Sequence, residues 1–169
     1  MSSHADSPPR AAVERLRAWR LAIVTAALYM ALDQITKQLV VHSLAPGERT
    51  SVFFGIDLTN MRNSGVAFGI LSGDGTAVTV LTIVAVVGLI AYFTARASVP
   101  MLWLPVGVVV GGALGNLLDR ARLGAVVDFI DPHIWPAFNL ADTGIVIGVL
   151  GLLYVIEGSG KHPVRSGSD

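Results

Sequence analysis

Two aspartates, Asp128 and Asp142, are the residues of this sequence whose chemistry stands out first. Each is flanked by apolar residues, and Asp142 opens an uninterrupted apolar run over residues 143–156. Burying a carboxylate is unfavourable, and an ionisable side chain in a membrane-type segment is a functional candidate by default. Two such carboxylates close together could act as a general acid and a general base.

The local sequence predicts different protonation states for the two aspartates. Asp128 lies between Val127 and Phe129, where desolvation raises the pKa of a carboxyl group. Asn139 is a good helix N-cap and would place Asp142 at the third helical position, where the helix dipole and free backbone amides favour an ionised carboxylate. Asp142 alone could be an ordinary helix-start residue, but for the pair we favour catalysis.

Composition indicates that the chain resides in a membrane. Of its 169 residues, 53% are hydrophobic and only 14% are charged, whereas a soluble domain has about 25% charged residues. The formal net charge of zero argues against nucleic acid as a partner. The chain has no cysteine, which excludes disulfides, zinc–thiolate sites and thiol nucleophiles.

Four apolar segments predict an all-α membrane protein with four transmembrane helices, at residues 19–41, 76–95, 97–118 and 138–156. Residues 44–75 are polar and alternate enough over 51–59 to suggest short strands, and residues 121–137 form a second polar region. We expect residues 1–18 to be a disordered cytoplasmic extension, 19–157 the four-helix transmembrane domain and 158–169 a flexible cytoplasmic tail.

The distribution of charge predicts the orientation of these helices. Seven basic residues lie on the side of the termini and four on the other side, so both termini should be cytoplasmic. At a rise of about 1.5 Å per residue, Asp33, Asn116 and Asp142 all lie roughly 20–24 Å from the cytoplasmic ends of their helices. This common depth predicts a polar site just below the outer surface.

Several smaller groups of polar residues allow two interpretations each. Asp33 and Lys37, at positions i and i+4, form either a mutual ion pair or a site in which Lys37 anchors something outside. Asn63, Ser64 and Gly65 form either a simple turn or a site where Asn63 offers its amide to a peptide and Gly65 allows close approach.

Three further possibilities concern the outer ends of the helices. Residues Asn116, Asp119 and Arg120 share one helix face and serve either as an interfacial cap or as substrate contacts. A metal site at Asp128, Asp131 and His133 is possible, but the spacing fits no strong metal motif, and residues 131–133 are more simply an exposed turn. His42, at the end of the first apolar segment, is interpreted as a residue of the membrane interface. A dyad of Ser64 and Lys37 is a minority interpretation.

Taken together, five segments resemble the lipoprotein signal peptidase (signal peptidase II) family, the bacterial intramembrane aspartyl proteases. The segments are residues 33–37, 63–68, 111–120, 127–130 and 138–142, and they occur in the family's order. The resemblance implies an enzyme of the bacterial cytoplasmic (inner) membrane that removes the signal peptide of diacylglyceryl-modified prolipoproteins. It implies cleavage before the lipidated cysteine and inhibition by the cyclic peptide globomycin.

The resemblance also implies roles for individual residues. The catalytic pair falls on Asp128 and Asp142. The substrate-binding residues, to which we add Gly65 for its close approach, fall on Asp33, Lys37, Asn63, Asn116, Asp119, Arg120 and Asn139. Residues 44–75 would supply an extracytoplasmic strand-rich cradle and a mobile helix. We expect no cofactor or metal, a monomer, and contact with membrane lipid.

Two rival interpretations come from other classes. A small four-span transporter or proton-relay protein could use the same buried carboxylates as carriers, although the chain shows no repeated halves. A purely structural four-span scaffold leaves the common depth of Asp33, Asn116 and Asp142 unexplained.

Overall fold

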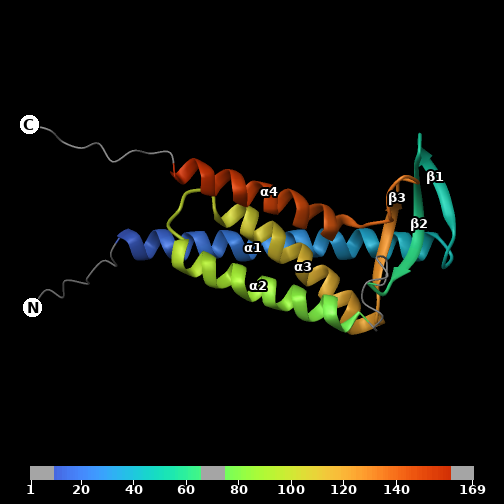
Figure 1. The fold of residues 1–169 in the computed structure, drawn as a ribbon, viewed down its shortest axis with the longest axis horizontal. Coiled ribbons are helices and arrows are strands. Elements are labelled where there is room, and N and C mark those ends of the chain that lie inside the picture. Colours follow the sequence, from blue (N-terminus) through green and yellow to red (C-terminus); the bar gives the residue numbers. More distant parts are fainter. Residues whose placement is uncertain (1–9, 66–74, 161–169) are drawn as a thin grey trace, which may run out of the picture.

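The described part of the chain folds into four long helices, with a three-stranded sheet across one end of them (Figure 1). The structure is a computed structural model and describes residues 10–65 and 75–160. In chain order the elements are α1 (Arg10–Ser43), β1 (Arg49–Phe53), β2 (Ile56–Asn63), α2 (Thr76–Arg96), α3 (Trp103–Leu123), β3 (Val126–Asp131) and α4 (Leu140–Gly160). The start of α1 and the end of α4 lie opposite the sheet (Figure 1).

The helices are displaced or longer than the sequence predicted. Helix α1 begins at Arg10, so the expectation of disorder was wrong for residues 10–18, where good helix formers such as Ala, Glu, Leu and Arg continue the helix. Helix α3 begins only at Trp103, because turns that include Pro100 precede it, and it continues past Asp119 to Leu123. Helix α4 runs to Gly160, so residues 158–160 are helical rather than tail.

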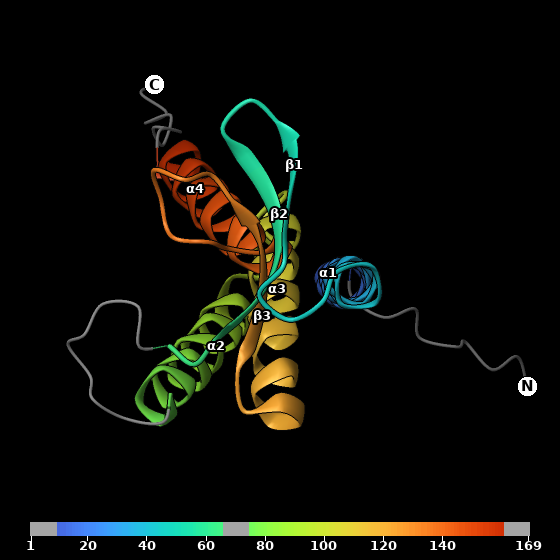
Figure 2. The same cartoon turned by 90° about the vertical axis from the view of Figure 1, so that its right-hand side faces the viewer.

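Helix α3 is the centre of the bundle, with α1, α2 and α4 arranged around it (Figure 2). Small residues allow this close packing. A Cβ added to Gly111 would lie 2.5 Å from the backbone oxygen of Ala26 on α1, and one added to Gly112 would lie 2.6 Å from that of Ala141 on α4. The backbones of α1 and α4 therefore approach α3 closely at the level of the polar residues.

An apolar core closes the end of the bundle opposite the sheet. Trp19 of α1 and Phe93 of α2 meet edge to face with ring centroids 4.9 Å apart. Buried apolar residues of α1, α3, α4 and the connection between α2 and α3 surround them: Ala18, Ala22, Ala97, Leu102, Val106 and Leu152. Stability at this end thus comes from apolar packing, which leaves the sheet end free for polar groups.

The sheet has the order β1-β2-β3, and both pairs of strands are antiparallel. The strands suggested within residues 51–59 are confirmed as parts of β1 and β2. The sequence predicts only a polar region over residues 121–137, whereas the structure has strand β3 there, and the β-branched Val126 and Val127 favour that strand. The register places Met61 opposite Asp128, and β3 is buried along most of its length.

Two of the described helices, α2 and α4, are long and apolar enough to cross a membrane by length and composition alone. Helix α1 is long enough but not apolar enough to be included, since it contains charged residues such as Asp33 and Lys37. Both of these side chains are buried inside the bundle. The outward faces of the helices carry large exposed apolar side chains, for example Leu28 on α1, Val84 on α2 and Leu150 on α4.

Candidate active site

Asn139 hydrogen-bonds to both Asp128 and Asp142 and so brings the two predicted aspartates into one site. Its side-chain amide donates to Oδ1 of Asp128 at 2.7 Å. Its side-chain oxygen accepts the backbone N–H of Asp142 at 3.0 Å, and its own backbone N–H donates to Oδ2 of Asp142 at 3.2 Å. The two aspartates are thus held on either side of one asparagine.

The start of α4 is built as a capping box. Asn139 precedes the first helical residue, and its reciprocal bonds with Asp142 satisfy two amides at the helix start. This confirms the prediction that Asn139 is the N-cap and that Asp142 occupies the third helical position. Because the N-terminus of a helix is electropositive, it favours the ionised carboxylate of Asp142.

Asp128 lies on β3 and is almost completely buried, with 1% of its surface exposed. Its Oδ2 accepts the side-chain amide of Asn63 at 2.8 Å. Burial raises the pKa of Asp128 to about 6, and the charge of Asp142 adds to this effect, while the hydrogen bonds from Asn63 and Asn139 oppose it. The raised pKa expected from the apolar sequence around Asp128 is therefore confirmed.

Asn63 is fixed by a turn at the end of β2. Its side-chain oxygen accepts the backbone N–H of Gly65 at 2.8 Å, and Gly65 has a φ of +89°, a conformation that glycine adopts readily. The amide of Asn63 therefore points at Asp128. The interpretation of this segment as a turn is confirmed, and the amide that was expected to reach a peptide donates to Asp128 instead.

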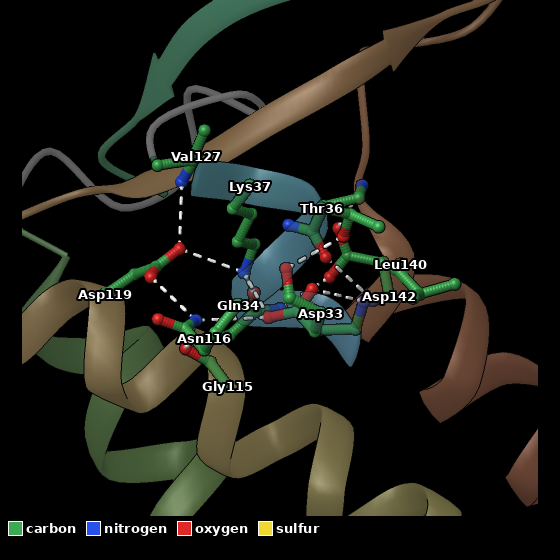
Figure 3. A network of polar contacts seen from close by, with 12 residues as sticks. Asp33, Gln34, Thr36, Lys37, Gly115, Asn116, Asp119, Val127, Leu140 and Asp142 are labelled. Carbon is green, nitrogen blue, oxygen red and sulfur yellow. Dashed lines mark hydrogen bonds and ion pairs between the residues drawn. The ribbon is translucent and has the colours of Figure 1, made fainter. Parts of the chain in front are cut away.

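Lys37 lies at the centre of a buried polar network beside Asp142 (Figure 3). Its Nζ lies 2.8 Å from Asp33 and 2.9 Å from Asp119, and it donates to the side-chain oxygen of Asn116 at 2.9 Å. The amide of Asn116 in turn donates to Oδ1 of Asp142 at 2.8 Å. Helices α1 and α3 together thus position the aspartate of α4.

The two carboxylates that contact Lys37 also hold neighbouring elements. Oδ1 of Asp33 accepts the backbone N–H of Ala141 in the first turn of α4 at 2.9 Å. Oδ2 of Asp119 accepts the backbone N–H of Val127 on β3 at 3.2 Å. The network therefore fixes the beginning of α4 and the strand that carries Asp128, and the predicted meeting of Asp33, Asn116 and Asp142 at one level of the bundle is seen in these contacts.

Two interpretations of Lys37 are wrong. The side chain cannot anchor anything outside, because only 1% of it is exposed and three acceptors surround its Nζ. The same contacts rule against a dyad with Ser64, which lies exposed beyond the end of β2. The mutual ion pair of Asp33 and Lys37 is present, and Asp119 extends it.

Arg120 belongs to a different part of the site from Asn116 and Asp119. Its Nε is buried and has no hydrogen-bond partner within the described residues. It lines a cavity of about 430 Å³ between α2 and α3, together with Thr76, Thr79 and Leu117. Its charge interacts with Asp142 and Asp128. Arg120 thus combines a buried donor that has no partner within the described residues with a position on the wall of this cavity.

The residues of the suggested metal site have other partners. Asp131 pairs with Arg49 of β1 at 3.0 Å, and His133 lies 2.8 Å from Asp57 of β2. Over residues 10–65 and 75–160, no three potential ligands gather as a metal site would require. His42 contacts the backbone oxygen of Gln38 at 2.7 Å.

A mobile helix is also expected within residues 44–75. Residues 66–74 of that range lie outside the described part of the chain.

Sequence reasoning gave no role to two further contributors. Gln34 donates from one amide nitrogen to Asp119 at 3.0 Å and to the backbone oxygen of Gly115 at 3.2 Å. Tyr29 donates its hydroxyl to the backbone oxygen of Leu140 at 2.8 Å. Tyr29 lies four residues before Asp33 on the same helix face, and this spacing could have identified it.

Two solved structures share this fold, and the titles of both describe a bacterial membrane enzyme determined by the in meso method. One, at 1.9 Å resolution, has a TM-score of 0.71 and 32% identity, with 85% of this chain and 94% of the other covered. The second, at 2.3 Å, has a TM-score of 0.75 and 30% identity, with 88% and 94% covered. The fold therefore defines a helical membrane enzyme.

The family follows from the sequence comparisons. Residues 25–157 match the family described as Signal peptidase (SPase) II. A lipoprotein signal peptidase of Halothermothrix orenii is 40% identical over 134 residues, with 78% of this chain and 92% of that protein covered. One of Syntrophotalea carbinolica is 43% identical over 154 residues, with 85% and 94% covered. The chain belongs to the signal peptidase II family and is thus an aspartic-type membrane protease.

Proposed function

We propose that Asp128 and Asp142 are the catalytic pair with which this signal peptidase removes signal peptides from lipoprotein precursors. The contacts of Asn139 with both aspartates support this most directly, because one residue fixes the two carboxylates in unlike surroundings. The unlike surroundings favour one protonated and one ionised carboxyl group, as acid–base catalysis requires.

In the proposed mechanism Asp142 is the base. Its carboxylate is stabilised by the start of α4 and by the amide of Asn116. It takes a proton from water, and the hydroxide attacks the carbonyl of the scissile peptide bond. Asp128, protonated because of its raised pKa, donates its proton to the developing oxyanion. When the C–N bond breaks, the proton on Asp142 passes to the leaving amine and the oxyanion proton returns to Asp128.

The substrate proposed here is a precursor whose cysteine carries a diacylglyceryl group, cleaved just before that cysteine. Arg120 supports this choice, because its buried Nε needs an acceptor and it lines a cavity between α2 and α3. An ester or peptide carbonyl of the lipidated substrate would supply that acceptor. A cyclic peptide inhibitor of the globomycin type would compete for the same donors.

All four helices cross the cytoplasmic membrane in this proposal, with both termini in the cytoplasm. The exposed apolar faces of α1, α2 and α4 support this arrangement, as do the buried positions of Asp33, Lys37 and Asn116. The site then lies near the outer face, at the sheet end of the bundle. Lipid surrounds a monomer, and catalysis needs no cofactor, so activity is expected to persist in excess chelator.

The proposal is tested by a gel-shift cleavage assay on a purified, diacylglyceryl-modified prolipoprotein. Wild type is compared with Asp128→Asn and Asp142→Asn, and Asp131→Asn serves as a carboxylate control on the strand that carries Asp128. Loss of an acid or base lowers the rate by at least about 100-fold, so both catalytic variants should be inactive and the control active. Retained cleavage by either folded catalytic variant would refute the pairing.

A further inference from the structure

Four large apolar side chains lie fully or largely exposed at the sheet end of the molecule. Phe53 and Phe54 are 74% and 101% exposed at the turn between β1 and β2. Ile134 and Trp135 are 96% and 67% exposed in the loop between β3 and α4. We call these four residues the apolar rim. Packing within the chain does not explain them, because their surfaces are left open.

The apolar rim lies on the side of the bundle where α4 runs. The sheet extends across the ends of the helices, and the β1–β2 turn projects past α4 (Figures 1 and 2). Helix α4 carries exposed apolar residues such as Val146, Ile147 and Leu150. A bilayer that covers α4 would therefore reach the projecting turn at the level where the helix begins.

Two ion pairs hold the rim in place. Arg49 of β1 contacts Asp131 of β3 at 3.0 Å, and Asp57 of β2 contacts His133 at 2.8 Å. His133 directly precedes Ile134, so the second pair ties the loop of Ile134 and Trp135 to the hairpin. Arg49, Asp57, Asp131 and His133 are thus paired with one another, and the large apolar side chains of the rim are left exposed beside them.

Tryptophan is enriched at the interface between lipid and water, and phenylalanine and aliphatic side chains of surface-bound segments insert at the boundary of headgroups and acyl chains. We propose that the apolar rim rests in the headgroup region of the outer leaflet beside α4 and anchors the sheet to the membrane surface. This inference rests on the proposed four-span arrangement. Since β3 carries Asp128, the anchor fixes the depth at which that carboxyl group meets the lipidated substrate.

The absence of cysteine from the sequence makes a direct test possible. Phe54→Cys and Ile134→Cys are each labelled with a nitroxide, and the full chain is reconstituted in vesicles of phosphatidylethanolamine and phosphatidylglycerol. Thr50→Cys, exposed on β1, is the matched control. Collisions with oxygen, which concentrates in lipid, are compared with collisions with a water-soluble nickel chelate. The ratio of oxygen collisions to nickel-chelate collisions should be several-fold higher at positions 54 and 134 than at position 50.

Equal access of the nickel chelate to all three positions would overturn the proposal. Labels that lie in water without substrate and become immobilised only when a precursor is added would also overturn it, and would assign the rim to peptide binding. As a second readout, the double variant Phe53→Ser, Phe54→Ser should cleave several-fold more slowly than wild type in vesicles but equally fast in detergent. An equal loss in both would contradict anchoring. None of these outcomes bears on the assay of Asp128→Asn and Asp142→Asn.

Discussion

Lys37 determines which way the side chain of Asn116 points. The ammonium group can only donate, so the asparagine presents its oxygen to Lys37 at 2.9 Å. The amide nitrogen is then directed to Asp142, which it contacts at 2.8 Å. A residue of α1 that touches neither proposed catalytic carboxyl group thereby sets the hydrogen bonding of one of them.

Replacing Lys37 with methionine should be strongly destabilising. The substitution leaves Asp33 and Asp119 without the cation between them, and removing one partner of a buried ion pair costs about 3–5 kcal/mol. Thermal unfolding in detergent measures the effect, with Arg20→Met, an exposed change on the same helix, as control. Adding Asp119→Asn to Lys37→Met should recover part of the loss. A single variant that unfolds like wild type would contradict this role.

Asn139 should contribute to activity separately from its contribution to stability. Asn139→Ser keeps an oxygen that can cap α4 but loses the bond to Asp128. A hydrogen bond to the neutral, protonated carboxyl group of Asp128 contributes about 0.5–1.5 kcal/mol, so kcat/KM should fall roughly 2- to 10-fold while the melting temperature changes little. Asn139→Ala should also lose the cap, which contributes about 1 kcal/mol. A serine variant as active as wild type would show that the bond to Asp128 does not matter.

Gly115 should tolerate no side chain. A Cβ at this position would lie 2.5 Å from Oδ2 of Asp33 and would push that carboxylate away from Lys37. Gly115→Ala should therefore destabilise the protein by about 1–3 kcal/mol, as overpacking does. Gly88→Ala on α2, where the added Cβ meets nothing within 4 Å, is the control. It should be neutral or stabilising by up to about 1 kcal/mol, and equal effects of the two changes would refute the explanation.

The raised pKa of Asp128 predicts how stability depends on pH. The folded protein holds this proton up to about pH 6, whereas an exposed aspartate releases it near 3.8. The contribution of Asp128 is therefore most favourable below about pH 4 and is lost as the pH rises through 6, a change of about 3 kcal/mol. Thermal unfolding of wild type and Asp128→Asn from pH 4 to 8 measures it. Wild type should lose stability relative to the variant, and parallel curves would contradict the shift.

The same pKa predicts the alkaline side of the activity profile. Because Asp128 must be protonated to donate to the oxyanion, kcat/KM should fall as the pH rises above about 6, approaching tenfold per pH unit. The profile is measured with the lipidated precursor. Asp131→Asn should show the same profile as wild type, since Asp131 pairs with Arg49 outside the site. A flat profile from pH 6 to 9 would refute Asp128 as the acid.

Most of the helical fold, and the start of α4 with its two candidate site residues, could be predicted from local sequence. Apolar length located the helices, and capping chemistry located Asn139 and Asp142, because both depend on residues close in the chain. Helix ends were less predictable, as the start of α1 at Arg10 demonstrates. Polar residues with high helix propensity can extend a helix beyond its apolar run. A hydropathy pattern alone does not predict this extension.

The partners within the site could not be predicted, because they depend on contacts distant in sequence. Lys37 was open to an outward role until its contacts with Asp119 and Asn116, on another helix, were known. The pairing of Met61 with Asp128 depends on strand β3, which lies within residues 121–137, a range that the sequence predicts only as a polar region. Arg120 shares a helix face with Asn116, yet it lines a separate cavity between α2 and α3.

The ion pair of Asp33 and Lys37 has a consequence for how the protein is made. Helix α1 leaves the ribosome first, before the chain that supplies Asp119, Asn116 and the amide of Ala141 has been synthesised. In the proposed four-span arrangement α1 crosses the bilayer. Since the two residues are one helical turn apart and 2.8 Å from each other, they would then enter it as a locally neutral pair. The helices made later add Asp119 and Asn116 as further partners of Lys37, and the same two charges then support the site.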